Sequence, residues 1–143
     1  MFSCQTPELQ NSDRSLRTEW LECNGTGDYA SGTITGCNSR RYHGLLVANL
    51  DHIGRHVLLS AREDGLVTEN GRIPLPSRKH PNAIYPDPSG SLKTFSASPY
   101  PTFVFEGPGF RLTRSLMLVR DRHTVLIRYS LKKTDSSAPA LKC

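Results

Sequence analysis

Thr124-Val-Leu-Ile-Arg-Tyr-Ser-Leu131 is the most regular stretch of this chain and determines the predicted fold class. Apolar or aromatic side chains occupy its alternate positions, namely Val125, Ile127, Tyr129 and Leu131. Mostly polar residues stand between them, and this period of two is typical of a β-strand with one face toward a core. The preceding Arg120-Asp-Arg-His123 predicts a turn, so we expect residues 110–119 to form the neighbouring strand.

Further short segments are predicted as strands, while no window shows a convincing helical stripe with caps. The predicted strands are 18–23, 29–34, 44–50, 56–60, 66–68, 73–75, 92–95 and 102–106. Residues 44–50 and 56–60 are continuous apolar runs, which favour strands buried on both faces. Asn70-Gly71 favours a hairpin turn, because both residue types tolerate a positive φ. The predicted fold is therefore all-β, an antiparallel β-sandwich.

Composition divides the chain into a leader, one domain and a tail. Residues 1–17 are polar and lack a period, residues 18–131 hold the predicted strands, and residues 132–143 form a polar tail. Within the domain, residues 74–91 are rich in proline. Because proline removes donors from a strand ladder, this segment is expected to be a long loop or crossover.

The charge and the cysteines exclude several classes of partner. The net charge is +5, but the basic side chains are scattered. A nucleic-acid partner is not expected, since affinity requires several phosphates neutralised on one face. Without a secretory signal or an apolar run of membrane-spanning length, a cytoplasmic protein with no membrane partner is expected. The four cysteines form no Cys-x-x-Cys pair and the histidines lack metal-site spacing, so neither a metal nor a cofactor is expected.

Local motifs for catalysis are weak. Gly25-Thr-Gly-Asp-Tyr-Ala30 fits a loose dinucleotide fingerprint, but it lacks the preceding buried strand and the following helix that contact a pyrophosphate. The closest carboxylate pairs are Glu19 with Glu22 and Glu63 with Asp64. Odd spacing on a strand turns such neighbours to opposite faces, which makes them poor glycosidase dyads. A pairing of Glu22 with Glu63 stays open, and no catalytic residue is assigned.

The remaining cluster of chemistry-bearing residues lies between positions 24 and 44. Its candidates for substrate or domain-interface contact are Asn24, Arg40, Arg41, Tyr42 and His43. Arginine offers a planar fork of donors, asparagine a donor and an acceptor, and tyrosine a ring that stacks on a sugar. This set suits a polyol or a neighbouring domain. The alternative is structural: the arginines pair with Glu19, Glu22 or Glu63 and tie loops together.

Three blocks of sequence in this region stand in a specific order. They are Glu19-Trp-Leu-Glu-Cys-Asn-Gly-Thr-Gly-Asp-Tyr-Ala-Ser-Gly-Thr33, then Asn38-Ser-Arg-Arg-Tyr-His-Gly-Leu-Leu-Val-Ala48, then Gly54-Arg-His-Val-Leu-Leu-Ser60. Together they resemble the opening of the N-terminal domain of bacterial and archaeal glycogen debranching enzymes of the amylo-α-1,6-glucosidase type. The resemblance covers about residues 18–131.

The resemblance implies a galactose-mutarotase-like supersandwich, of which this chain holds the leading part. In such enzymes the hydrolytic carboxylates lie in a following (α/α)6 barrel, so the chain alone is expected to be inactive. The implied partners are that barrel and glycogen or a related α-glucan, and the parent reaction is hydrolysis of α-1,6-glucosidic branch linkages. The five candidates would contact either the sugar or the barrel.

Two other functions stay open. An autonomous α-glucan-binding module predicts affinity for glycogen without any barrel and would benefit from an exposed ring at Trp20 or Tyr42. A basic nucleic-acid-binding β-domain predicts steeply salt-dependent affinity, and the resemblance favours it least.

Overall fold

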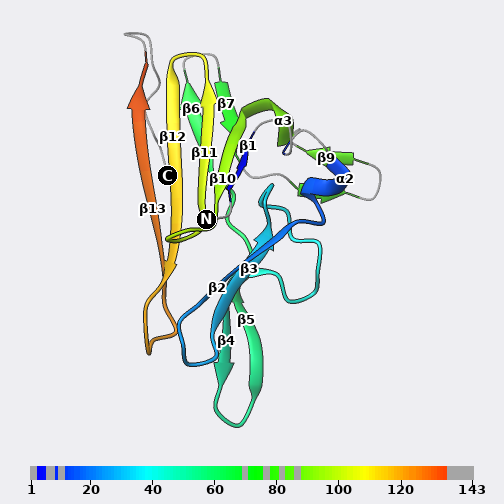
Figure 1. Cartoon of the computed structure of the whole chain (residues 1–143), viewed down its shortest axis with the longest axis vertical. Helices are drawn as coiled ribbons and strands as arrows, with labels where there is room; N and C mark the ends of the chain where they lie inside the picture. The colour runs from blue at the N-terminus through cyan, green and yellow to red at the C-terminus, as the bar shows by residue number, and fades with distance from the viewer. Residues whose placement is uncertain are drawn as a thin grey trace.

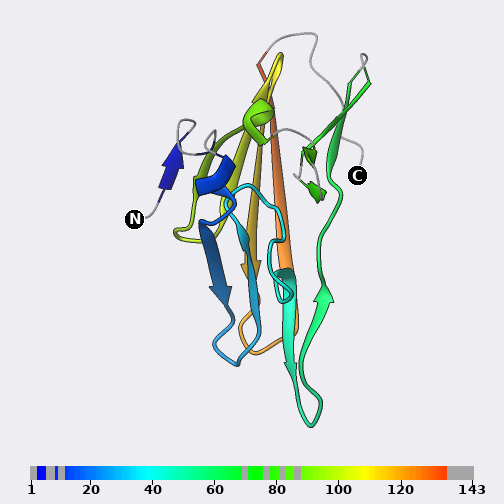
Figure 2. The ribbon, with the colours of Figure 1, turned by 90° about the vertical axis from the view of Figure 1, so that its right-hand side faces the viewer.

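The computed structural model describes residues 3–5, 9, 12–68, 71–75, 78–80, 83–85 and 88–134. These residues form an all-β, antiparallel β-sandwich in which a five-stranded and a four-stranded sheet face each other (Figure 1, Figure 2). The predicted fold class is confirmed. Within the described ranges, no helix is long and apolar enough to cross a bilayer.

The five-stranded sheet has the order β1-β10-β11-β12-β13. Its strands are β1 (Ser3–Gln5), β10 (Leu92–Ser96), β11 (Thr102–Gly107), β12 (Phe110–Leu118) and β13 (Val125–Lys133). The predicted turn between β12 and β13 is confirmed, and its Asp121 has a φ of 58°. Burial alternates along β12, so one face of the sheet points into the core.

The four-stranded sheet has the order β2-β3-β4-β5. Its strands are β2 (Glu19–Cys23), β3 (Tyr29–Thr33), β4 (Gly44–Leu50) and β5 (Gly54–Leu59). On β2, Glu19 and Leu21 are exposed while Trp20 is buried, which separates an outer face from an inner one. The β4–β5 hairpin projects beyond the other strands at one end of the molecule (Figure 1, Figure 2).

Aromatic side chains fill the core between the two sheets. The largest fully buried ones are Phe95, Phe103, Phe105 and Phe110, all from the five-stranded sheet. Trp20 reaches them from β2, with its ring 6.0 Å from that of Phe103 in an edge-on arrangement. The indole Nε1 donates to the carbonyl of Thr33 at 3.0 Å, so the buried polar atom is satisfied.

The expectation that β5 is buried on both faces is wrong. β4 is buried along most of its length, but β5 is exposed or half-buried throughout, with Leu58 52% exposed. The difference follows from position in the sheet: β4 lies between two strands, whereas β5 is an edge strand. Two similar apolar runs therefore reach different environments.

Two predicted irregular segments contain secondary structure. Residues 74–91, expected to be a long loop, include the antiparallel pair β8 (Arg78–His80) and β9 (Ala83–Tyr85) and the short helix α3 (Pro88–Ser91). The leader includes β1 at the edge of the five-stranded sheet, the short helix α2 (Ser12–Ser15) and a fully buried Leu9. In residues 74–91, the prolines limit the length of the strands, because each proline removes a ladder donor, but strands of three residues still form.

The predicted hairpin is confirmed, but Gly71 belongs to the second strand, so residues 69 and 70 rather than Asn70-Gly71 connect the two strands. β6 (Gly65–Thr68) pairs with β7 (Gly71–Pro74), with Thr68 opposite Gly71. Residue 71 has a φ of 117°, a conformation that glycine adopts without strain. Residues 69 and 70 lie outside the described part of the chain.

A buried ionic network fixes the connection between the two sheets. Arg114 on β12 is 5% exposed and donates from Nη1 to Oδ2 of Asp64 at 3.2 Å. The Tyr129 hydroxyl donates to the same oxygen, and Arg62 lies 3.1 Å from the other. The Arg114 guanidinium also lies 4.5 Å from the centre of the Phe103 ring. Burial and the Asp64 carboxylate raise the pKa of the Tyr129 phenol.

Candidate functional site

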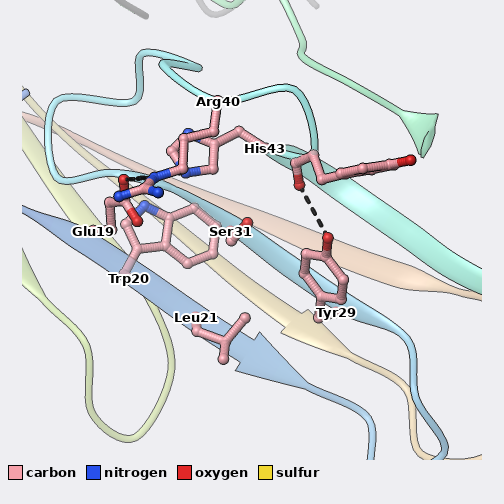
Figure 3. Close-up of a pocket in the computed structure, with 8 residues that line it drawn as sticks. Glu19, Trp20, Leu21, Tyr29, Ser31, Arg40 and His43 are labelled. Atoms are coloured by element: carbon pink, nitrogen blue, oxygen red, sulfur yellow. Dashed lines mark hydrogen bonds and ion pairs between the residues drawn. The ribbon is translucent and has the colours of Figure 1, made fainter. Parts of the chain in front are cut away.

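A pocket of about 370 Å³ opens on the outer face of the four-stranded sheet. It is lined by Glu19, Trp20, Leu21, Tyr29, Ser31, Arg40, Tyr42 and His43 (Figure 3). β2 and β3 supply its floor, and the connection between β3 and β4 supplies one wall. Its volume falls in the lower part of the range of small-molecule pockets.

A three-residue polar cluster forms one side of the pocket. Arg40 donates from Nε to Oε1 of Glu19, and Nε2 of His43 lies 3.6 Å from the same oxygen. The backbone N–H of Ser39 donates to Nδ1 of His43 at 3.1 Å, which makes Nδ1 the acceptor and leaves the proton on Nε2. The Arg40 side chain is 70% exposed, so its remaining donors face solvent above the pocket.

The surroundings of His43 favour its neutral form. Burial lowers the pKa of its imidazole from the ordinary 6.5, and the nearby Arg40 acts in the same direction, while Glu19 opposes them. A neutral His43 hydrogen-bonds without adding charge. Glu19 and Arg40 compensate each other, so the cluster presents donors and acceptors with little net charge.

Two tyrosine rings form the other side of the pocket, and each is held in place. The Tyr29 hydroxyl donates to the backbone carbonyl of Tyr42 at 3.3 Å (Figure 3). The Arg55 guanidinium lies 5.6 Å from the Tyr29 ring centre, and that of Arg41 lies 5.5 Å from the Tyr42 ring centre. Tyr42 is 41% exposed, which leaves ring surface available to a ligand.

A second pocket of about 410 Å³ adjoins the first. It is lined by Leu21, Cys23, Gly25, Gly27, Asp28, Tyr29 and Arg55. Leu21 and Tyr29 belong to both pockets, so the two form neighbouring hollows on one face. Leu21 is 63% exposed and lies at their junction.

The loop that borders the second pocket is fixed by buried polar contacts. Oδ1 of Asn24 accepts from the backbone N–H of Thr26 at 2.9 Å and of Asp28 at 3.1 Å. The carboxylate of Asp28, 1% exposed, accepts from the backbone N–H of Asn49 at 2.9 Å and lies 2.7 Å from Nδ1 of His123. The β2–β3 loop is thereby tied to β4 and to the turn before β13.

The structure brings together three of the five predicted site residues. Arg40, Tyr42 and His43 line the first pocket, and Arg41 packs against the Tyr42 ring beside it. Asn24 lines neither pocket, is 5% exposed and fixes the loop. The expected arginine pairing is found for Arg40 with Glu19, so this residue has a structural contact as well as a place in the pocket.

Other sequence-based expectations have different outcomes. Trp20 does not offer an exposed ring, because it is 5% exposed and packs on Phe103, whereas Tyr42 does. The Gly25–Ala30 fingerprint is followed by a strand rather than a helix, so the dinucleotide geometry is missing. Glu19 and Glu22 lie on opposite faces of β2. Burial raises the pKa of Glu22, but its side chain lines neither pocket.

Sequence reasoning missed Leu21, Tyr29 and Arg55. A signal was available for Leu21, because the period of two in β2 places residues 19, 21 and 23 on one face. Tyr29 joins them only through the observed strand register, which sets it opposite Cys23. In the ranges that the structure describes, no group of three or more potential metal ligands is close enough to hold an ion.

The comparisons with known proteins point to one family. The family model described as glycogen debranching enzyme N terminal matches residues 18–142 of the chain. No curated protein and no solved structure matches the sequence. The match includes every residue of both pockets.

Proposed function

The chain belongs to the glycogen debranching enzyme N-terminal family, and on this premise we propose that it is a non-catalytic module of such an enzyme. It packs on a separate catalytic barrel and shapes the approach of the glucan. The parent enzyme hydrolyses α-1,6-glucosidic branch linkages, in glycogen breakdown in the cytoplasm. The free, exposed thiol of Cys23 is compatible with that reducing compartment.

The observation that carries the proposal is the first pocket on the outer sheet face. Its exposed Tyr42 ring, apolar Leu21 and compensated Glu19–Arg40 pair combine a stacking surface with both donors and acceptors. Saccharides need these contacts, because a sugar ring has an apolar face and hydroxyls around its edge. The site is therefore assigned to contact with an α-glucan.

The positions of the buried carboxylates support a non-catalytic role. Glycoside hydrolysis requires one carboxylic acid to protonate the leaving oxygen and one carboxylate to activate water or attack. Asp28 and Asp64 are engaged as buried acceptors in the loop and in the Arg114 network. Glu19 is paired with Arg40. The acids of the parent reaction are assigned to the barrel.

Exposed apolar side chains on the projecting β4–β5 hairpin support the presence of a second domain. Ile53 is 65% exposed and Leu58 is 52% exposed. Apolar surface of this kind is stabilised when another domain covers it.

An autonomous α-glucan-binding module is the second candidate, and the exposed ring of Tyr42 favours it. Glycogen affinity electrophoresis of the full chain, run beside a debranching assay on limit dextrin, tests both functions. Retardation without hydrolysis is expected for a glucan-contacting module. Hydrolysis by the chain alone would contradict the non-catalytic role. Loss of retardation in Arg40→Ala or Tyr42→Ala, at unchanged stability, would assign the contact to the first pocket.

A further inference from the structure

The second pocket extends the proposed contact surface beyond the first pocket. It shares Leu21 and Tyr29 with the first pocket, so these two side chains lie at the boundary between the hollows. Both lie on the outer face of β2 and β3, where Leu21 pairs with Ser31 and Cys23 pairs with Tyr29. A ligand that crosses Leu21 would contact both pockets.

The walls of the second pocket are fixed before any ligand binds. Tyr29 is anchored at its hydroxyl by the Tyr42 carbonyl, and Arg55 lies over its ring. The loop on the other side is held through Asn24 and Asp28. A surface that is already ordered loses little conformational entropy when it binds, which favours affinity.

Glycines let the loop backbone approach a ligand closely. Gly25 has a φ of 88°, and a Cβ added there would meet nothing within 4 Å, so the space beside it is open. Gly27 has a φ of 103°, and a Cβ added there would meet the Asn49 side chain at 3.2 Å, so this glycine serves the packing of the loop on β4. Both conformations are accessible to glycine without strain, and the open space beside Gly25 lets a ligand approach the backbone there.

The chemistry of the joined surface fits an extended neutral polyol. Aromatic and apolar side chains form its centre, a compensated ion pair forms one end and the glycine loop forms the other. Arg41 and Arg55 lie against tyrosine rings rather than beside each other, so their charges are not gathered into an anion site. A chain of sugar units presents alternating apolar faces and hydroxyls along such a surface.

We propose that the two pockets form one groove that binds an α-glucan chain of several glucosyl units, with Tyr29 and Leu21 at its centre. This inference rests on the proposed glucan contact and deepens it, because it assigns a second subsite and makes chain length the basis of recognition. Short saccharides occupy only one pocket, whereas longer ones contact both.

Titration of the full chain with maltose, maltotetraose and maltoheptaose tests the length dependence. The wild type is expected to bind maltoheptaose at least tenfold more tightly than maltose. Arg55→Ala is expected to reduce that ratio to threefold or less, because it loosens the Tyr29 ring and removes one wall. Arg111→Ala is the matched control: it removes an exposed arginine that pairs with Glu106 on the other sheet, and it should leave the ratio unchanged.

The exposed thiol of Cys23 gives an independent readout that does not require a variant. Its alkylation by N-ethylmaleimide, located by peptide mass spectrometry, should be slowed by saturating maltoheptaose and not by saturating maltose. Equal affinity for all three saccharides, with no protection of Cys23, would overturn the second subsite while leaving the first pocket as the glucan contact. Failure of every saccharide and of glycogen to bind would overturn both proposals. Protection of Cys23 by an isolated catalytic domain, and not by saccharide, would reassign the groove to a protein partner.

Discussion

Asp64→Asn tests whether the buried ionic network holds the two sheets together. Asp64 lies in the connection that follows the four-stranded sheet and accepts from Arg114 and Tyr129 of the five-stranded sheet. Asparagine keeps the shape of the side chain and removes its charge. The Arg114 guanidinium would then stay buried without its counter-ion, and its Nε already has no partner among the described residues.

The expected cost is large because both side chains are inaccessible. The side chains of Arg114 and Asp64 are 6% and 8% exposed, and breaking a buried ion pair by removing one partner costs about 3–5 kcal/mol. That is a large part of the roughly 5–15 kcal/mol by which a domain is stable. With a urea dependence of about 2 kcal/mol/M, the unfolding midpoint should fall by about 2 M.

The chain contains its own reporter and its own control for this experiment. Trp20 is the single tryptophan and lies buried against Phe103, so its fluorescence follows separation of the sheets during urea unfolding. Glu106→Gln breaks the exposed pair with Arg111, 3.1 Å apart, and should cost at most about 1 kcal/mol.

A double variant distinguishes the lost ion pair from a general packing defect. Adding Arg114→Met to Asp64→Asn removes the uncompensated charge and should recover part of the lost stability. The reasoning is refuted if Asp64→Asn and Glu106→Gln lower the midpoint equally, or if the double variant is less stable than Asp64→Asn.

Three further predictions concern the site. Asn24→Ala should destabilise the fold by about 2 kcal/mol, since two backbone N–H groups lose their acceptor. It should also weaken binding of maltoheptaose more than binding of maltose, because the loop that borders the second pocket loses its anchor; unchanged binding of both saccharides would contradict a part for this loop in the groove. Arg40→Ala should change the free energy of unfolding by less than about 1 kcal/mol, because the Arg40 side chain is 70% exposed. It should also weaken the retardation of the protein by glycogen. A loss of stability with unchanged retardation would make Arg40 purely structural. Burial lowers the pKa of the His43 imidazole from 6.5, so the unfolded chain binds the proton more readily than the folded one. The free energy of unfolding should therefore fall as the pH decreases below about 6.5. Between pH 7 and pH 5, urea titrations should show a smaller loss of stability for His43→Gln than for the wild type, and an equal loss would exclude His43 as a cause.

The sequence was sufficient for the strands whose burial follows a local pattern. The alternation in β13 and the short turn before it predicted the β12–β13 pair, because the side-chain period of a strand is local information. Asn70-Gly71 predicted the β6–β7 hairpin, because the turn preference of this dipeptide is also local information. β5 was predicted to be buried, since an apolar run does not reveal whether a strand lies at the edge of its sheet.

Residues whose environment depends on distant partners could not be predicted. Arg114 is one of many scattered basic residues in the sequence, yet it is buried because Asp64, fifty positions away, compensates it. Asp28 is buried through contacts with Asn49 and His123, which belong to other elements. Strand pairing and sheet packing bring these groups together, and no local spacing encodes them.

The candidate site was predicted in part for a similar reason. Arg40, Tyr42 and His43 form a contiguous block, so their chemistry was visible in the sequence. Leu21 and Tyr29 line both pockets, but they become neighbours only through the β2–β3 register.

The central claim is that this debranching-enzyme N-terminal module contacts an α-glucan through the outer face of its four-stranded sheet. Isothermal titration calorimetry of the purified full chain with maltoheptaose tests this claim most directly. Saturable binding is predicted for the wild type, with at least tenfold weaker binding in Tyr42→Ala and unchanged binding in Arg111→Ala. An absence of binding in the wild type, or equal weakening in both variants, would contradict it.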